Sequence, residues 1–322
     1  MTPNKLQEMT RAAILGFAVG DALGVPAEFM TRAQLDKRPV TGMLAGGAHG
    51  QPAGTWSDDT SMTLCTLVSL TEKGVDYRDL MHRFALWLWE AKYTARDKVF
   101  DAGGTCRSAI FNFVHGAVPP DCGETAGYCC GNGSLMRLLP AALYFRGKGQ
   151  GALTAETAAV IHDLSACTHG HPRCRLACGL YCAAAFALLD GTGKDALPEV
   201  LKSALDFYRT LPEFAGVLHE FEPLPEMADR SRDSIRSSGY VVDTLEAALW
   251  CLLATDSYRD CVLKAVNLGE DTDTVAAVAG GLAGILYGEA AIPADWLAAL
   301  CRRSQIEALC TRFAESLPGG AV

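Results

Sequence analysis

The chain has 322 residues, of which 49% are hydrophobic and 20% are charged, and its formal net charge is −9. Such a chain can bury a large core, and because no linker-like stretch divides it we expect a single domain over residues 1–322. The acidic balance excludes sequence-independent binding of nucleic acid through a basic face, which needs clustered Lys and Arg.

Helical periodicity dominates the sequence, and the alternating β-branched stretches typical of strands are scarce. In chain order, we predict helices or helix pairs over residues 10–24, 58–73, 77–93, 105–114, 134–145, 153–166, 173–189, 197–209, 241–254, 258–267, 273–287 and 293–316. Gly16, Gly20 and Gly24 share one face of the first helix, where a second backbone can approach closely. The predicted fold class is all-α.

Three segments between these helices are irregular. Residues 42–54 are rich in Gly, residues 119–133 are rich in Gly and Pro, and residues 211–239 are predicted to form a long polar loop. Long loops in a compact domain are often lids or binding loops. These segments are therefore candidates for parts of a ligand-binding site.

The cysteines and the apolar segments bear on the compartment. There are thirteen cysteines, and Cys174, Cys178 and Cys182 recur every four residues, which is typical of a buried helix stripe in a reducing compartment. Asp21 interrupts the apolar run near the N-terminus, and no cleavage site follows it, so a signal peptide is not predicted. No run of eighteen uncharged apolar residues suggests a membrane span. We expect a cytoplasmic protein.

Two acidic stretches far apart in the sequence have the same character. Residues 57–60 (SDDT) and 271–274 (DTDT) each place two carboxylates beside hydroxyl residues, in front of an apolar helix. Alone, each stretch could be a helix N-cap with an acidic first turn. A cap needs only one such residue, however, and the pattern occurs twice. Oxygen ligands of this kind suit Mg²⁺ or Mn²⁺, so together the stretches favour one metal site.

The sequence resembles the ADP-ribosylglycohydrolase family along nearly its whole length. The matching segments are GFAVGDALGVPAEF (16–29), GTWSDDTSM (54–62), GNGSLMRLLPAAL (131–143), THGHP (168–172), GYVVDTLEAALWC (239–251) and NLGEDTDTVAAVAGGLAGILYG (267–288). Residues 101–107 (DAGGTCR) are most similar to the branch that includes dinitrogenase reductase-activating glycohydrolase, whose members remove ADP-ribose from protein arginine.

The resemblance implies a compact orthogonal multi-helix fold with two Mg²⁺ or Mn²⁺ ions at the bottom of a cleft. The implied metal ligands are Ser57, Asp58, Asp59, Asp271, Asp273 and Thr274, with Glu28 beside or on the second metal. Ser57 replaces a Thr that is common in the family and keeps a hydroxyl. The five carboxylates of this set carry about −5 and two divalent ions about +4, so the filled site would be nearly neutral.

The resemblance also implies a set of substrate-binding residues: Gly131, Asn132, Gly133, Ser134, His169 and Tyr240. The loop of residues 131–134 would receive phosphate, His169 would lie near phosphate and ribose, and Tyr240 would stack on the adenosine. Each has a plainer interpretation: a glycine turn with a Ser cap, a structural histidine, and an aromatic in the core. His171 is expected to be structural.

The activity implied is hydrolysis of the N-glycosidic bond between ADP-ribose and the arginine of a modified protein, with ADP-ribose as product. Asp58, Asp59 or Glu28 would accept the proton of the attacking water, and Asp101 would orient the guanidinium. Gly104 departs from the Asn that the arginine-directed branch tends to have there. Two alternatives stay open: hydrolysis of O-linked ADP-ribose, on serine or in O-acetyl-ADP-ribose, and binding of ADP-ribose without catalysis.

Overall fold

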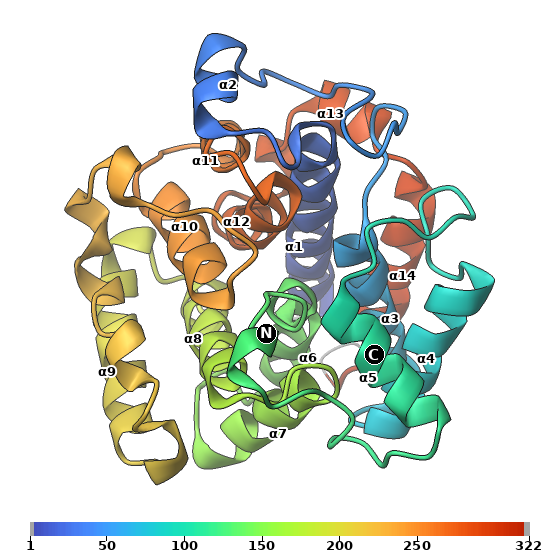
Figure 1. Cartoon of the computed structure of the whole chain (residues 1–322), viewed down its shortest axis with the longest axis vertical. Coiled ribbons are helices and arrows are strands. Elements are labelled where there is room, and N and C mark those ends of the chain that lie inside the picture. Colours follow the sequence, from blue (N-terminus) through green and yellow to red (C-terminus); the bar gives the residue numbers. More distant parts are fainter. Residues whose placement is uncertain (1–2, 319–322) are drawn as a thin grey trace.

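Helices account for all the regular structure in residues 3–318, which are the residues that the computed structural model describes (Figure 1). The predicted all-α class is therefore confirmed. The helices are α1 Pro3–Gly24, α2 Arg32–Lys37, α3 Asp58–Lys73, α4 Tyr77–Glu90, α5 Gly104–Val114, α6 Leu139–Gly147, α7 Ala155–Ala166, α8 Pro172–Leu189, α9 Leu197–Arg209, α10 Val241–Leu253, α11 Tyr258–Val266, α12 Thr272–Tyr287, α13 Ala294–Ala299 and α14 Arg303–Glu315.

The centre of the molecule is the antiparallel pair formed by α1 and α12 (Figure 1). A Cβ added at Gly20 would lie 2.1 Å from the carbonyl oxygen of Ala276, and one at Gly24 would lie 2.2 Å from Cα of Asp273. The glycine face of α1 is thus pressed directly against the α12 backbone, as its four-residue spacing predicts. The pairing brings the end of α1 to the beginning of α12.

Helix α3 packs against α1, α4 and α14 and brings the other acidic stretch to the same region. Ser57 is its N-cap, and the Ser57 hydroxyl accepts a hydrogen bond from the backbone N–H of Asp59 at 3.3 Å. The capping interpretation is therefore correct for Ser57. It does not explain the carboxylates of Asp58 and Asp59.

Most predicted helices begin and end within a few residues of the observed ones, and the differences have local causes. Helix α2 has only six residues and is absent from the prediction, although Thr31 and Gln34 form a capping box. The predicted helix over residues 134–145 starts as a 3-10 turn, Leu135–Arg137, before α6. The predicted element over residues 293–316 is a helix pair that breaks at Arg302, whose φ is +53°.

The segment of residues 211–239 is more ordered than the loop that we predict from its polarity. It contains four 3-10 helices: Pro212–Phe214, Leu218–Glu220, Leu224–Asp229 and Arg232–Ser234. Phe214, Phe221 and Met227 are fully buried and anchor the segment to the core. These few large apolar side chains hold the polar stretch in place. Because they do not recur with a helical or strand period, the sequence pattern does not reveal this order.

Within residues 3–318, α8 is the one helix whose length and composition would allow it to cross a membrane. However, 78% of this helix is buried inside the protein. It packs against α6, α7, α9 and α10. Its Cys174, Cys178 and Cys182 are buried free thiols, as their spacing predicts. These observations identify α8 as a core helix.

We expect Gly20→Ala to destabilise the fold, because the added methyl group would overlap the α12 backbone. Overpacking of this kind costs about 1–3 kcal/mol of unfolding free energy. Gly216→Ala is the matched control, since a Cβ there meets no atom within 4 Å. Thermal denaturation of both variants checks the prediction. Equal melting temperatures would show that α1 and α12 can separate without cost.

Candidate metal centre and substrate cavity

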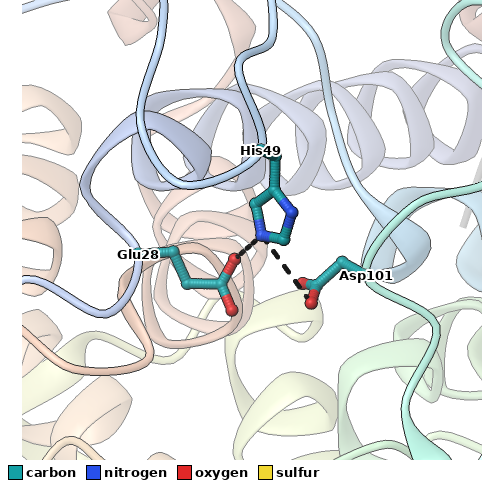
Figure 2. Close-up of side chains that lie close together, drawn as sticks. All are labelled: Glu28, His49 and Asp101. Atoms are coloured by element: carbon teal, nitrogen blue, oxygen red, sulfur yellow. Dashed lines mark hydrogen bonds and ion pairs between the residues drawn. The ribbon is translucent and has the colours of Figure 1, made fainter.

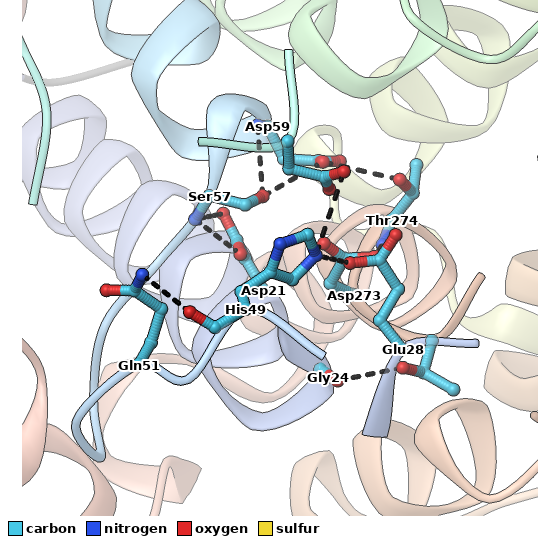
Figure 3. A network of polar contacts seen from close by, with 11 residues as sticks. Asp21, Gly24, Glu28, His49, Gln51, Ser57, Asp59, Asp273 and Thr274 are labelled. Carbon is cyan, nitrogen blue, oxygen red and sulfur yellow. Dashed lines mark hydrogen bonds and ion pairs between the residues drawn. The ribbon is translucent and has the colours of Figure 1, made fainter. Parts of the chain in front are cut away.

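The two acidic stretches meet in the structure at the N-termini of α3 and α12 (Figure 3). The Thr274 hydroxyl donates a hydrogen bond to Oδ2 of Asp59 at 3.3 Å, across 215 positions of sequence. Ser57 donates to the same Asp59 oxygen at 3.2 Å. Asp59 and Asp273 are almost completely buried. The metal-ligand residues implied by the resemblance thus surround one small volume.

A cavity of about 250 Å³ opens on this cluster. Carboxylates line one side of it, and the glycine-rich loop with His169 lines the other. Its lining residues are Glu28, Asp58, Asp59, Asp101, Gly103, Gly104, Thr105, Cys106, Gly131, Asn132, Gly133, Met136, His169, Asp271 and Thr274. An acidic floor facing neutral donors is suited to a ligand that carries both hydroxyl groups and phosphate.

The carboxylates strongly disfavour one another's ionisation. Burial, followed by the charges of Asp101 and Asp271, raises the pKa of Glu28 to about 10. Burial and neighbouring carboxylates also raise the pKa values of Asp58, Asp59 and Asp273 well above their ordinary range. Several like charges in one buried volume cannot all ionise unless cations compensate them.

The donor set fits hard divalent cations. Among residues 3–318, Oδ1 of Asp59 and Oδ2 of Asp273 are buried carboxylate oxygens with no hydrogen-bond partner. Buried carboxylate oxygens are normally satisfied by donors or by metal ions. With the hydroxyls of Ser57 and Thr274 beside them, these atoms form the all-oxygen environment that Mg²⁺ and Mn²⁺ prefer.

Asp21 supports the site from α1 and is absent from the predicted site residues. Its carboxylate accepts a hydrogen bond from the backbone N–H group of Ser57 (Figure 3). It also accepts hydrogen bonds from the backbone N–H group of Thr60 and, at 2.6 Å, from the Thr60 hydroxyl. Burial raises its pKa to about 6. A lone Asp inside the apolar first helix was the available signal, because a buried carboxylate needs partners.

His49 is a second residue that sequence reasoning missed. It belongs to the Gly-rich segment 42–54, which turns tightly at residues 46–51 and packs Gly47 against the backbone of Pro26. Its Nε2 lies 2.5 Å from Oε2 of Glu28 and 3.7 Å from Oδ1 of Asp101 (Figure 2). The imidazole therefore bridges two carboxylates from separate segments. The available signal was one histidine in a glycine-rich stretch leading to the acidic residues.

Asp101 reaches the cavity from the loop before α5. Its φ of +58° is a left-handed conformation that costs free energy for a residue other than glycine. Burial raises the pKa of its carboxyl group, and nearby His49 opposes this shift. A Cβ at Gly104 would meet no atom within 4 Å, so the space beside Asp101 is open.

The loop of residues 131–134 faces the cavity only in part. Asn132 donates hydrogen bonds to Oδ2 of Asp271 at 2.8 Å and to the Thr244 hydroxyl at 2.9 Å, which ties the loop to the acidic side. Gly133 passes so close to His169 that a Cβ would lie 2.8 Å from the ring. Ser134 points away from the cavity into the core, where it accepts a hydrogen bond from Ser165.

The two remaining predicted substrate residues lie in different places. His169 lines the cavity. The structure does not bring Tyr240 into it: this side chain lines a neighbouring hollow of about 330 Å³, donates its hydroxyl proton to Glu220, and lies beside the Arg173 guanidinium. Its backbone pairs with Gly131. His171 caps α8, as its expected structural role implies.

Comparisons with known proteins agree over almost the whole chain. The model of the family described as ADP-ribosylglycohydrolase matches residues 2–320. The ADP-ribosylarginine hydrolase Tri1 of Pseudomonas putida is 34% identical over 99% of this chain and 81% of its own length. The ADP-ribosyl-[dinitrogen reductase] glycohydrolase of Rhodospirillum rubrum is 34% identical over 93% and 92%. A solved ADP-ribosylglycohydrolase-related protein complex matches with a TM-score of 0.78 at 32% identity, covering 97% and 99%.

We expect the metal-free protein to lose stability as the pH rises. The folded-state pKa values of these carboxyl groups are raised, to about 6 for Asp21 and about 10 for Glu28. The folded state then holds more protons than the unfolded state, so the unfolding free energy falls from about pH 5 to about pH 8. Thermal melting in chelator measures this slope. Saturating Mg²⁺ should raise the melting temperature most at the higher pH. A metal-free stability independent of pH would contradict the prediction.

Asp273→Asn should make the metal-free protein more stable at neutral pH and abolish most of its stabilisation by Mg²⁺. The substitution preserves side-chain volume and removes one like charge from the cluster. In the wild type, metal at a hundred times its Kd should add about 2.7 kcal/mol. Melting with and without Mg²⁺ measures both effects. An unchanged response to Mg²⁺ would leave Asp273 as a helix-capping residue only.

Proposed function

We propose that this chain, which belongs to the ADP-ribosylglycohydrolase family, hydrolyses the N-glycosidic bond between ADP-ribose and an arginine side chain of a modified protein. Family membership establishes the coarser activity, hydrolysis of ADP-ribosyl groups. One observation carries the finer proposal. Asp101 lies in the same cavity as the acidic cluster and the loop of residues 131–133, so a guanidinium and the ribose attached to it can be held together.

The proposed cofactors are two Mg²⁺ or Mn²⁺ ions, held by the carboxylates of the acidic cluster with Ser57 and Thr274; these carboxylates belong to Glu28, Asp58, Asp59, Asp271 and Asp273. Ions of this kind lower the pKa of a bound water and bind adjacent hydroxyl groups, which is the chemistry they would supply here. The unpartnered oxygens of Asp59 and Asp273 support this assignment. So does the mutual repulsion of the carboxylates, which two cations would relieve.

The residues of the chain provide the remaining steps. Asp58, Asp59 or Glu28 accepts the proton of the attacking water, since each has a carboxylate in the cavity. The developing positive charge on the ribose is stabilised by this acidic surface. Loop residues Gly131 and Asn132 hold the phosphate and ribose side of the substrate. ADP-ribose and the unmodified protein arginine are the products.

Asp101 and Glu28 define the leaving-group end of the cavity in this proposal. Their carboxylates are near enough for the single Nε2 atom of His49 to contact both (Figure 2). A guanidinium is planar and offers several N–H donors, which suits two carboxylates at one end of a cavity. An ether or ester oxygen offers no donor to them.

Hydrolysis of O-linked ADP-ribose is the second candidate, and one observation favours it. The open space at Gly104 lacks the amide side chain that would add a hydrogen bond beside Asp101. A solely ADP-ribose-binding role is less consistent with the structure, because every implied metal-ligand position carries an oxygen donor. The thirteen free thiols fit a reducing compartment, and we propose that the protein acts in the cytoplasm.

Asp101→Asn should slow hydrolysis of arginine-linked ADP-ribose by roughly ten- to a hundredfold, because it removes a charge-assisted hydrogen bond worth about 1.5–3 kcal/mol. Binding of free ADP-ribose should be retained. Asp97→Asn is the matched control, because Asp97 belongs to the same loop but is 82% exposed and pairs with Arg302. Initial rates on arginine- and serine-linked substrates, compared side by side, test the proposal. A wild type that cleaves the serine linkage faster would establish the O-linked candidate instead.

A further inference from the structure

Arg137 is a fully buried cation that follows Met136, a residue lining the cavity. It ends the 3-10 turn that follows the loop of residues 131–134, and its side chain has no solvent exposure. Its guanidinium lies 4.8 Å from the centroid of the Phe84 ring. Within residues 3–318, its Nε and Nη1 atoms have no hydrogen-bond partner. Burying a cation with unsatisfied donors is costly, so Arg137 is a candidate for a role beyond packing.

The hydrogen bonds that Arg137 does make come from Nη2. This nitrogen donates to the carbonyl oxygen of Leu164 at 2.9 Å and to the hydroxyl oxygen of Thr168 at 2.7 Å. Both acceptors lie at or just beyond the C-terminal end of α7. Arg137 thus holds the Thr168 hydroxyl, while Arg137 itself does not line the cavity.

The same hydroxyl contacts His169. Its Oγ1 lies 2.9 Å from Nδ1 of the imidazole, while the backbone N–H of His169 donates to Ser165. The other ring nitrogen, Nε2, lies beside the glycine-rich loop, where a Cβ at Gly133 would be 3.3 Å away, and His169 lines the cavity. Nε2 has no hydrogen-bond partner in residues 3–318. The side of the ring that a ligand can reach is therefore the free one.

We propose that Arg137 and Thr168 are positioning residues that fix the tautomer of His169, so that its Nε2–H donates a hydrogen bond to bound ADP-ribose. A guanidinium can only donate, so the Thr168 oxygen must accept from it. The single hydroxyl proton is then directed to Nδ1, because an imidazole nitrogen is a stronger acceptor than the other nearby group, the Cys106 thiol. With Nδ1 as an acceptor, the proton of the neutral ring resides on Nε2.

The electrostatic environment supports this arrangement. Burial and the positive charge of Arg137 lower the pKa of His169 to about 3, so the ring is neutral at neutral pH. A neutral ring without a fixed tautomer would present a lone pair to phosphate oxygens in part of the molecules, and that contact is repulsive. The inference rests on the proposed function only in taking ADP-ribose as the ligand.

The test compares the wild type with Thr168→Val, which removes the hydroxyl at nearly constant volume, and Thr168→Ser, which keeps it. Long-range ¹H–¹⁵N NMR of the full-length protein labelled on histidine reports the tautomer of each ring. We expect an Nε2–H tautomer for His169 in the wild type and the serine variant, and loss of the single tautomer in the valine variant. ADP-ribose binding, measured calorimetrically with Mg²⁺, should weaken about three- to tenfold in the valine variant only, as expected for one neutral hydrogen bond.

Two controls separate positioning from general destabilisation. The signal of His162, a buried histidine that contacts the Tyr208 hydroxyl, should not change in any variant. Thr66→Val removes another buried hydroxyl, bonded only to the Met62 carbonyl, and should alter neither His169 nor binding. An Nδ1–H tautomer in the wild type, or an unchanged tautomer in Thr168→Val, overturns the inference. If the tautomer behaves as expected but arginine-linked substrate is not cleaved, the proposed function fails and the positioning role stands.

Discussion

The close antiparallel packing of α1 on α12 is the contact on which the site depends. On the glycine face of α1 the two backbones lie so close together that a side-chain Cβ would overlap the α12 backbone. This approach delivers Glu28, just beyond α1, to the first turn of α12, where Asp271 and Asp273 begin the helix. Asp21, seven positions before Glu28 in the sequence, holds the N-terminus of α3 and its two aspartates. A single helix therefore aligns three acidic segments.

Gathering these carboxylates opposes folding, and the surrounding structure offsets the cost. The raised pKa values of Glu28 and Asp273 mean that the cluster is partly protonated without metal, so it is less repulsive than its formal charge implies. The four aspartates of the two acidic stretches sit at the N-termini of α3 and α12, where the helix dipole favours negative charge. The apolar core formed by α1, α8 and α12 supplies the remaining stability. The remaining repulsion is what the proposed divalent cations would relieve.

The opposite side of the cavity is built on a different principle. There the groups are neutral: glycine backbone, the Asn132 amide and a His169 ring whose pKa is lowered to about 3. The buried cation of Arg137 acts on this side through hydrogen bonds and not through direct contact with the cavity. Between the two sides, the Asn132 amide donates a hydrogen bond to Asp271, which connects the loop to the acidic cluster. A ligand with anionic and hydroxyl ends has one suitable surface for each.

The sequence by itself determined the helices, the glycine face of α1 and the two acidic stretches, because these features depend on local periodicity and residue type. It also pointed to Asn132, Asp101 and His169, which face the cavity. Only the tertiary structure decided that Ser134 turns into the core, that Tyr240 lies in a neighbouring hollow, and that His49 and Asp21 serve the site. The direction of a side chain from a loop or a 3-10 turn is set by partners distant in sequence. No local pattern encodes those partners, and burial against them determines which polar groups face the ligand.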